Sequence, residues 1–342
     1  MYLVTGGSGY FGETLTKKLL DQGHRVRIFD LNLPSFAHAN LEYFKGDICD
    51  SVAINTACEG VQCIQHNVAQ VPIAKDRKLF WDVNHGGTKN LLEAAFSKKV
   101  QKVIYTSSSA VYGVPKKNPV TEADAPCPAE AYGKAKYSGE LLCKEYIEKG
   151  LDTSIIRPRT ILGHGRLGIF QILFEWIYQN ANIPVLGKGE NIYQFVHADD
   201  LADACIRAGD LSGPDIFNIG TDRYGSMSSV LSNLITYAHS TSKIRHIPFR
   251  LAVLGMNITS VLGLSPLGAY HSLMYGRSMY FNISHAQKKL NFAPRYSNDE
   301  MFQDSYKWYL EHREAILSGK YTGSKHQSAL KEGVLSLVRK II

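Results

Sequence analysis

The sequence lacks the features that mark membrane-spanning and nucleic-acid-binding proteins. None of its apolar runs reaches the roughly 20 residues that a membrane-spanning helix needs. The formal net charge is +7, but no basic run is interleaved with aromatic residues, so we expect no nucleic-acid partner. The first strand is predicted at the start of the chain, which leaves no room for a signal peptide and favours a cytoplasmic protein.

Cysteine is also scarce, and its spacing excludes two further classes of protein. The six cysteines are dispersed, with no C-x-x-C pair and no histidine at metal-ligand spacing. A disulfide scaffold or a zinc site would need clustered cysteines. We therefore predict no metal site, and expect all six cysteines to be reduced core residues.

What the sequence does contain begins with a short apolar run that ends in a glycine-rich turn, Thr5-Gly-Gly-Ser-Gly-Tyr-Phe-Gly12. Gly6 permits the turn, Gly9 lets backbone N–H groups approach a pyrophosphate, and Gly12 lets the following helix pack closely on the strand. The positive end of that helix, expected from Phe11 to about Gln22, then faces the phosphates.

A second predicted strand, Arg25 to Phe29, ends at Asp30. A carboxylate at this place accepts a hydrogen bond from a ribose 2′-hydroxyl and repels a 2′-phosphate. The two features together predict a site for NAD rather than NADP. The alternative is a strand–turn–helix with no ligand.

Strands and helices alternate along the first half of the chain. Further strands are predicted at residues 41–45, 61–69, 102–106 and 153–157, with helices at 51–58, 79–96 and 131–149. This alternation predicts an α/β fold with a Rossmann-type, doubly wound parallel sheet, and it places ligands at the carboxyl ends of the strands.

Beyond Pro158 the alternation is less regular. We predict a loop at 163–168, a helix at 170–179, a turn at 184–189, a strand and helix over 195–206, a strand at 216–219 and an apolar lid over 247–267. The expected division is an NAD-binding domain of residues 1–158 with about 195–220, and a smaller interleaved substrate-binding region of 159–194 and 221–320. Residues 321–342 form a loose tail.

One pair of residues carries candidate chemistry. Tyr132 and Lys136 are four residues apart on a predicted helix, so they share a face. A cation beside a tyrosine stabilises the phenolate and lowers its pKa, which makes the phenol a usable acid and base near neutrality. Ser107, Ser108 and Ser109 follow the strand at 102–106, where a hydroxyl can donate to the substrate oxygen that the tyrosine protonates.

In this order the motifs resemble those of the extended short-chain dehydrogenase/reductase family, of the NAD-dependent epimerase/dehydratase type. The resemblance covers about residues 1 to 310. It is carried by Thr5–Gly12, Asp30, Gly46-Asp47-Ile48, Val83-Asn84, Gly87–Asn90, Ser107–Gly113, Tyr132–Lys136 and Phe195-Val-His-Ala-Asp-Asp200.

The resemblance implies an enzyme with bound NAD and a Ser108, Tyr132 and Lys136 site. It implies that cofactor contacts come from Gly6, Ser8, Gly9, Tyr10, Phe11, Gly12, Asp30, Asp47, Ile48, Val68, Ala69, Tyr132, Lys136 and Pro158. Members of the family are often dimers through the two helices expected at 79–96 and 131–149. A scaffold that binds NAD without turnover is disfavoured because the catalytic set is intact.

Two branches of the family compete. The favoured one is nucleotide-sugar epimerisation through a transient keto intermediate. Dehydratases and decarboxylases generally carry an acid just after the hydroxyl donor, where this chain has Ser109 and Ala110. The alternative is a dehydrogenase similar to the 3β-hydroxysteroid dehydrogenases, acting on an apolar alcohol; the apolar stretch from Ile247 and the segment 280–290 carry that resemblance.

The substrate residues are expected to be Ser108, Ser109, Tyr132, Arg159 and Tyr193. Many nucleotide-sugar enzymes have an arginine before the F-V-H segment that clamps the diphosphate. This chain has Tyr193-Gln194 there, and Arg159, Arg166 and Arg277 are the candidates to replace the arginine.

The end of the chain forms a separate pattern. Apolar residues from Leu330 to Ile341 fall on one helical face, with basic residues elsewhere. Such a helix can dock on the protein itself, which is the favoured interpretation, pair with another subunit, or lie on an anionic membrane through residues 328–342.

Overall fold

The computed structural model describes residues 1–70, 77–248 and 276–319. A seven-stranded sheet forms its centre, and every pairing in that sheet is parallel. The strands are β1 (Tyr2–Thr5), β2 (Val26–Asp30), β3 (Leu41–Lys45), β4 (Cys63–His66), β5 (Lys102–Thr106), β6 (Thr153–Pro158) and β10 (Ile216–Ile219). This confirms the predicted α/β fold.

The strand order is β10-β6-β5-β4-β1-β2-β3. The chain therefore winds outward in one direction from β1 and in the other from β4. Between these two strands the connections leave toward opposite faces of the sheet, which opens a crevice at their carboxyl ends. Such a crevice is where α/β sheets of this kind bind dinucleotides.

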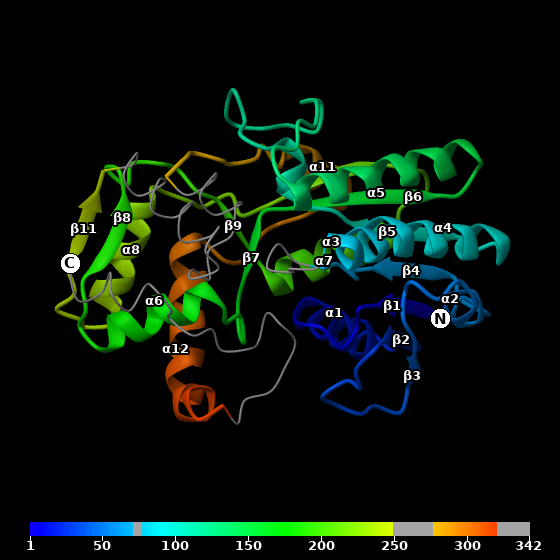
Figure 1. Cartoon of the computed structure of the whole chain (residues 1–342), viewed down its shortest axis with the longest axis horizontal. Coiled ribbons are helices and arrows are strands. Elements are labelled where there is room, and N and C mark those ends of the chain that lie inside the picture. The colour runs from blue at the N-terminus through cyan, green and yellow to red at the C-terminus, as the bar shows by residue number, and fades with distance from the viewer. Residues whose placement is uncertain (71–76, 249–275, 320–342) are drawn as a thin grey trace.

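Helices cover both faces of the sheet (Figure 1). On one face lie α1 (Tyr10–Asp21), α7 (Ala198–Gly209) and α11 (Ser284–Leu290), and on the other α2 (Ser51–Ala57), α4 (Thr88–Ser97) and α5 (Ala131–Glu148). Val4 and Ile104 pack into the first core, whereas their neighbours Leu3 and Tyr105 pack into the second. This alternation follows from the two-residue period of a strand that is buried on both faces.

A second group of elements packs around its own aromatic-rich core, on the left in Figure 1. It contains α6 (Ile169–Tyr178), α8 (Met227–Tyr237) and α12 (Asn298–Leu317), with β8 (Ile183–Leu186) paired to β11 (Ile244–Ile247). The short pair β7 (Thr160–Leu162) and β9 (Phe195–His197) lies between this group and the large sheet.

The structure corrects several predicted elements. The turn expected at 184–189 contains most of strand β8, and β7, β11, α8, α11 and α12 were not predicted. The helix expected at 79–96 is divided into α3 (Arg77–Trp81), a π-helical turn (Asp82–Gly87) and α4. Cys49 and Cys127 are exposed, so only four of the six cysteines are core residues; all six are free thiols.

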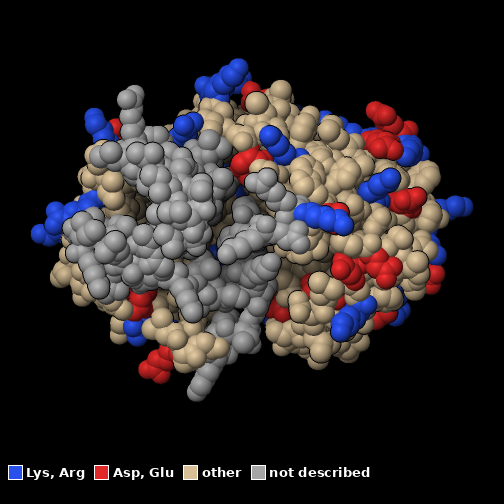
Figure 2. Space-filling model, in the orientation of Figure 1, with Lys and Arg blue, Asp and Glu red and all other residues tan. Residues whose placement is uncertain are grey.

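Some predictions concern residues outside the described ranges. The apolar lid over 247–267 is described only at residues 247 and 248, and the tail at 321–342 is not described. The division into two domains stays a prediction. In the part of the chain that the structure describes, no helix is long and apolar enough to cross a membrane. Positive and negative side chains are interspersed on the coloured surface in Figure 2.

A buried ion pair ties together β5, α5 and β6, the three elements that carry the candidate chemistry. Arg157 at the end of β6 donates from Nε and Nη2 to the two carboxylate oxygens of Glu140 on α5, at 2.9 and 2.6 Å. Ser107, directly after β5, donates to the same carboxylate at 2.6 Å. The third guanidinium nitrogen of Arg157, Nη1, donates to the Tyr112 hydroxyl at 2.6 Å. Burial alone would lower the pKa of Arg157, but the hydrogen bonds and charge of Glu140 raise it and keep the guanidinium charged.

We predict that Glu140→Gln lowers the free energy of unfolding by about 3–5 kcal/mol, because it leaves the Arg157 guanidinium buried without a counter-charge. Urea denaturation of the full chain measures this loss. Glu145→Gln on the same helix is the control, since Glu145 pairs with Lys149 at an exposed site, and should stay close to wild type. Equal stability of the two variants would contradict the role given to the ion pair.

Candidate active site

The glycine-rich turn after β1 has the shape that a dinucleotide site requires. Gly6 has a φ of +70°, which favours glycine. A Cβ at Gly12 would lie 2.0 Å from the Gly6 carbonyl oxygen, so only glycine lets α1 pack this closely on the turn. Gly9 caps α1 without any side-chain hydrogen bond. The first turn of α1 thus offers uncapped N–H groups and a positive helix end to an anion.

Asp30 lies beside this turn at the end of β2. Its carboxylate accepts from the backbone N–H of Ser8 at 3.2 Å and of Asn32 at 3.0 Å. Ser8 in turn donates from its hydroxyl to the Asn32 carbonyl at 2.7 Å. Asp30 therefore faces the loop that would hold the dinucleotide.

The remaining predicted cofactor residues lie at the same edge of the sheet. Asp47 and Ile48 follow β3, and Val68 and Ala69 follow β4. The backbone of Val68 is so near Gly6 that a Cβ on Gly6 would lie 3.1 Å from the Val68 nitrogen. Tyr10 and Phe11 open α1 and are buried in the core, and Pro158 ends β6.

Ser108, Tyr132 and Lys136 come together at the carboxyl end of β5. The Ser108 hydroxyl lies close enough to the Tyr132 phenol to lower its pKa, and it accepts from the backbone N–H of Ala110 at 3.2 Å. Lys136 is buried one helical turn further along α5 and donates to the Thr106 carbonyl at 2.8 Å. The three residues thus present a hydroxyl, a phenol and an ammonium group from a strand end and one helix face.

The acid–base balance of this group differs from the prediction. The pKa of Tyr132 is raised to about 12, mainly by burial and also by the nearby charge of Glu130, while Ser108 and Arg166 act in the opposite direction. Burial also lowers the pKa of Lys136 to about 8, against the charges of Cys143 and Glu140. The predicted lowering of the phenol pKa is therefore wrong for the protein alone, because desolvation outweighs the hydrogen bond and the positive charge.

Three other predicted substrate residues form a second cluster next to the first. Arg159 donates from Nη1 to the Ser109 hydroxyl at 2.9 Å, and its guanidinium lies 4.6 Å from the ring centre of Tyr193. The Tyr193 hydroxyl bonds the hydroxyl of Thr160 at 2.9 Å. Ser109, Arg159 and Tyr193 are all buried.

Several residues that support the site were missed from the sequence. Glu130 caps α5 by accepting from the backbone N–H of Tyr132 at 2.7 Å and of Gly133 at 2.6 Å. Glutamate is not among the preferred N-cap residues, and the preference of acidic residues for helix N-termini is the only sequence signal for this contact. Gln194 is buried and donates to the Thr221 carbonyl at 2.6 Å, so it has a structural role; no sequence signal indicates this contact.

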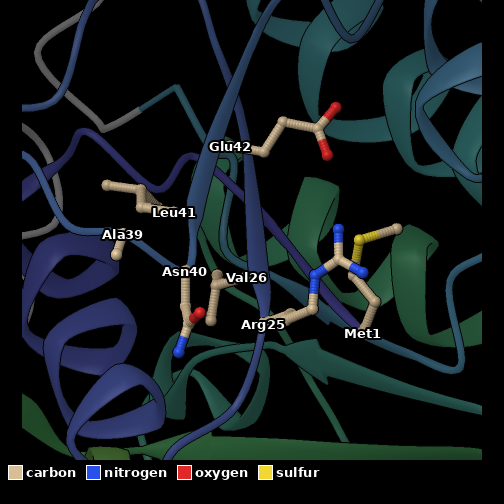
Figure 3. Close-up of a pocket in the computed structure, with 7 residues that line it drawn as sticks. All are labelled: Met1, Arg25, Val26, Ala39, Asn40, Leu41 and Glu42. Carbon is tan, nitrogen blue, oxygen red and sulfur yellow. The ribbon is translucent and has the colours of Figure 1, made fainter.

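A surface cavity elsewhere does not belong to this site. It is lined by Met1, Arg25, Val26, Ala39, Asn40, Leu41 and Glu42 (Figure 3). These residues lie at the amino ends of β1, β2 and β3, opposite the glycine-rich turn. Among the described residues, no group of three or more His, Cys, Asp or Glu side chains could hold a metal ion.

Comparison with known proteins agrees with this geometry. Residues 2–220 match the model of the NAD dependent epimerase/dehydratase family. The chain belongs to this family. It is an NAD-dependent enzyme of the extended short-chain dehydrogenase/reductase type, as its sequence motifs predicted.

Individual relatives differ in their named activities. The chain is 53% identical to "Uncharacterized protein y4nG" of Sinorhizobium fredii over 98% of this chain and 85% of that protein. It is 29% identical to human sterol-4-alpha-carboxylate 3-dehydrogenase, decarboxylating, over 88% of this chain and 86% of that protein. It is 34% identical to UDP-glucose 4-epimerase of Mycolicibacterium smegmatis over 64% of this chain and 76% of that protein.

A solved structure shares the fold. MoeE5 in complex with UDP-glucuronic acid and NAD is similar with a TM-score of 0.76 at 22% identity, over 91% of this chain and 99% of that chain.

The Asp30 carboxylate should set the choice between NADH and NADPH. Asp30→Asn should weaken NADH binding about tenfold, because one charge-assisted hydrogen bond to the ribose becomes a neutral one, and should reduce the preference over NADPH. Titration of cofactor fluorescence measures both affinities. Asp21→Asn, at the exposed end of α1, is the control. Wild-type protein that binds NADPH as tightly as NADH would refute the role of Asp30.

Burial of Lys136 on folding lowers its pKa from 10.5 to about 8. Between these values the unfolded chain binds more protons than the folded protein, so stability rises with pH across this window and falls as pH drops through 8. Relative to Lys136→Met, cofactor-free wild type should gain about 3 kcal/mol from pH 7 to 10.5.

Urea denaturation at several pH values measures this difference. Lys144→Met serves as the exposed control on the same helix and should show no such pH dependence relative to wild type. A difference between wild type and Lys136→Met that does not change with pH would contradict a buried lysine with a lowered pKa.

Proposed function

We propose that this enzyme oxidises a secondary alcohol of a nucleotide sugar to a transient ketone and returns the hydride to the opposite face, which makes it an epimerase. The observation that carries the proposal is the meeting of Ser108, Tyr132 and buried Lys136 at the carboxyl end of β5, with the Ser108 hydroxyl beside the Tyr132 phenol. A phenol beside a hydroxyl can bind one carbinol oxygen and move its proton.

The described residues fit NAD. The first turn of α1, which has no side-chain cap, would hold the pyrophosphate, and Asp30 would bind a ribose. The residues after β3 and β4 would contact the adenine. Lys136, whose ammonium group is held at the Thr106 carbonyl, would hold the second ribose. When bound, NAD would supply the hydride acceptor and a positive charge.

In the proposed reaction Ser108 donates a hydrogen bond to the carbinol oxygen and fixes its position. Tyr132, as the phenolate, removes the hydroxyl proton while the hydride leaves the same carbon, and the reverse transfer reforms the alcohol. Positive charge near the phenol must overcome the burial that raises its pKa to about 12. Lys136, with its pKa near 8, is placed to relay the proton.

Nucleotide sugars are favoured by two observations. The named epimerase is 34% identical to this chain. The positions after Ser108 are Ser109 and Ala110, so this segment supplies no carboxylate for a second proton transfer in elimination. We also propose that two copies of the chain pair through α4 and α5, because Phe96 and Leu141 on these helices are exposed apolar side chains that a dimer would bury.

The second candidate is an alcohol dehydrogenase with an apolar substrate. It is supported by the sterol dehydrogenase relative, which matches over 88% of this chain. It is also supported by Gln194, which stands where many nucleotide-sugar enzymes have a diphosphate-binding arginine and is engaged in backbone hydrogen bonds.

We predict that Tyr132→Phe lowers kcat by about 10²–10⁴-fold, because it removes the group that transfers the proton, and that it still binds NAD. Tyr137→Phe, on the next turn of α5, is the matched control and should keep near-wild-type activity. The assay follows conversion of UDP-sugars and release of NADH by purified protein. A Tyr132→Phe enzyme as active as wild type would remove the central catalytic assignment.

The same assay separates the two candidates. An epimerase keeps its NAD tightly bound and interconverts UDP-sugars without net NADH. A dehydrogenase exchanges NAD freely, leaves UDP-sugars unchanged and releases NADH with apolar alcohols.

A further inference from the structure

One side of the second group of elements carries exposed apolar side chains. Leu310 and Leu317 of α12 are 39% and 50% exposed, and Tyr178 at the end of α6 is 49% exposed. On the opposite side of α12, Phe302 and Tyr309 are buried in the aromatic-rich core. α12 therefore has two apolar faces: one packs on the core, and the other is left uncovered by the described part of the chain.

The three exposed side chains form one patch. Leu310, Arg313 and Leu317 are spaced three and four residues apart, so they follow one another along a single helix face. Arg313 joins this face to α6, because its guanidinium lies 4.2 Å from the ring centre of Tyr178. Two hydrogen bonds to Glu175 of α6, at 2.8 and 2.6 Å, hold the guanidinium there. We call Leu310, Leu317 and Tyr178 the α12 patch; its two helices are labelled in Figure 1.

The chain leaves α12 directly beside this patch. α12 ends at Leu317, and Gly319, with a φ of +70°, turns the chain out of the helix. Residues 320–342 lie outside the described ranges, and their sequence predicts an amphipathic helix near the end of the chain. The predicted apolar face consists of Leu330, Val334, Leu337, Val338 and Ile341.

The length of the intervening chain lets this segment reach the patch. Residues 318–329 separate α12 from the predicted helix, and an extended chain of that length spans about 40 Å. The patch covers only about 10 Å of α12, from Leu310 to Leu317. Because the segment belongs to the same chain, its effective concentration at the patch is on the order of millimolar. A second copy of the protein or a membrane has no such advantage.

Charges beside the two apolar faces are complementary. Near the patch, α12 exposes Glu311 and Glu314 against Lys307. The predicted helix carries Lys331 and Lys340 on either side of its apolar face. A helix that runs back along α12 brings these basic side chains toward the two glutamates.

We propose that residues 328–342 form a helix that docks on the α12 patch of the same chain. The apolar face of the segment covers Leu310, Leu317 and Tyr178, and its basic side chains lie near the acidic residues of α12. A helix of this length is only marginally stable by itself in water. Its formation therefore depends on the contact with α12.

Hydrogen exchange of the full chain, read by mass spectrometry on the peptide that contains residues 328–342, tests the proposal. In wild type the amides of this segment should exchange at least about tenfold more slowly than those of an unstructured chain, because a docked helix protects them. Leu310→Asp combined with Leu317→Asp should remove this protection. Both side chains are exposed, so the core stays intact. Val52→Asp, at a 74% exposed site on α2, is the matched control and should keep the protection.

A substitution on the other side of the contact locates the docking site. Val334→Asp should remove the protection as the pair of α12 substitutions does. Adding Val334→Asp to that pair should cause little further loss, because both changes break the same contact.

Four results would overturn the proposal. Two of them are exchange of the wild-type segment at the rate of an unstructured chain, and protection that survives Leu310→Asp with Leu317→Asp. The third is protection that grows over about a tenfold rise in protein concentration, which would assign the segment to a second copy. The fourth is protection that appears only with vesicles of phosphatidylcholine and phosphatidylserine, which would assign it to an anionic membrane.

Discussion

The carboxylate–guanidinium pair of Glu140 and Arg157 fixes the relative positions of the segments on which the candidate chemistry depends. Glu140 lies on α5 two helical turns after Tyr132, and Arg157 lies in β6 directly before Pro158. Ser107, which follows β5, donates to the same carboxylate. The pair is buried where desolvation is costly, so its geometry must be satisfied on all sides. One interaction thus sets the spacing between a helix and two strand ends.

The three consecutive serines after β5 have different partners as a result. Ser107 donates to the Glu140 carboxylate, Ser108 lies beside the Tyr132 phenol, and Ser109 accepts from the Arg159 guanidinium. The first contact is structural, the second serves the proposed proton transfer, and the third positions a residue predicted to bind the substrate. A short segment therefore couples the stability of the sheet to the geometry of the site, and the parallel sheet places that segment beside the NAD-binding turn.

The parts of this arrangement that depend on local pattern could be predicted from the sequence. The strand at 102–106 has the predicted bounds, and the glycine-rich turn lies beside Asp30. Strand β8 was missed because Pro184 and two glycines suggest a turn, although a proline is tolerated in a short two-stranded sheet. The pairing of Ser109 with Arg159 and the raised pKa of Tyr132 could not be predicted, since both depend on burial between segments distant in sequence.

The central claim is that Tyr132 and Ser108 act on the carbinol from which hydride passes to NAD. The most direct test is rapid mixing of the purified holoenzyme with the alcohol that it converts, deuterated at the carbinol carbon, while the near-ultraviolet absorbance of reduced nicotinamide is followed. The account predicts a reduced-nicotinamide signal that deuterium slows and that Tyr132→Phe abolishes. Conversion of the alcohol with no such signal, or with one that the Tyr132→Phe enzyme still gives at full rate, would contradict it.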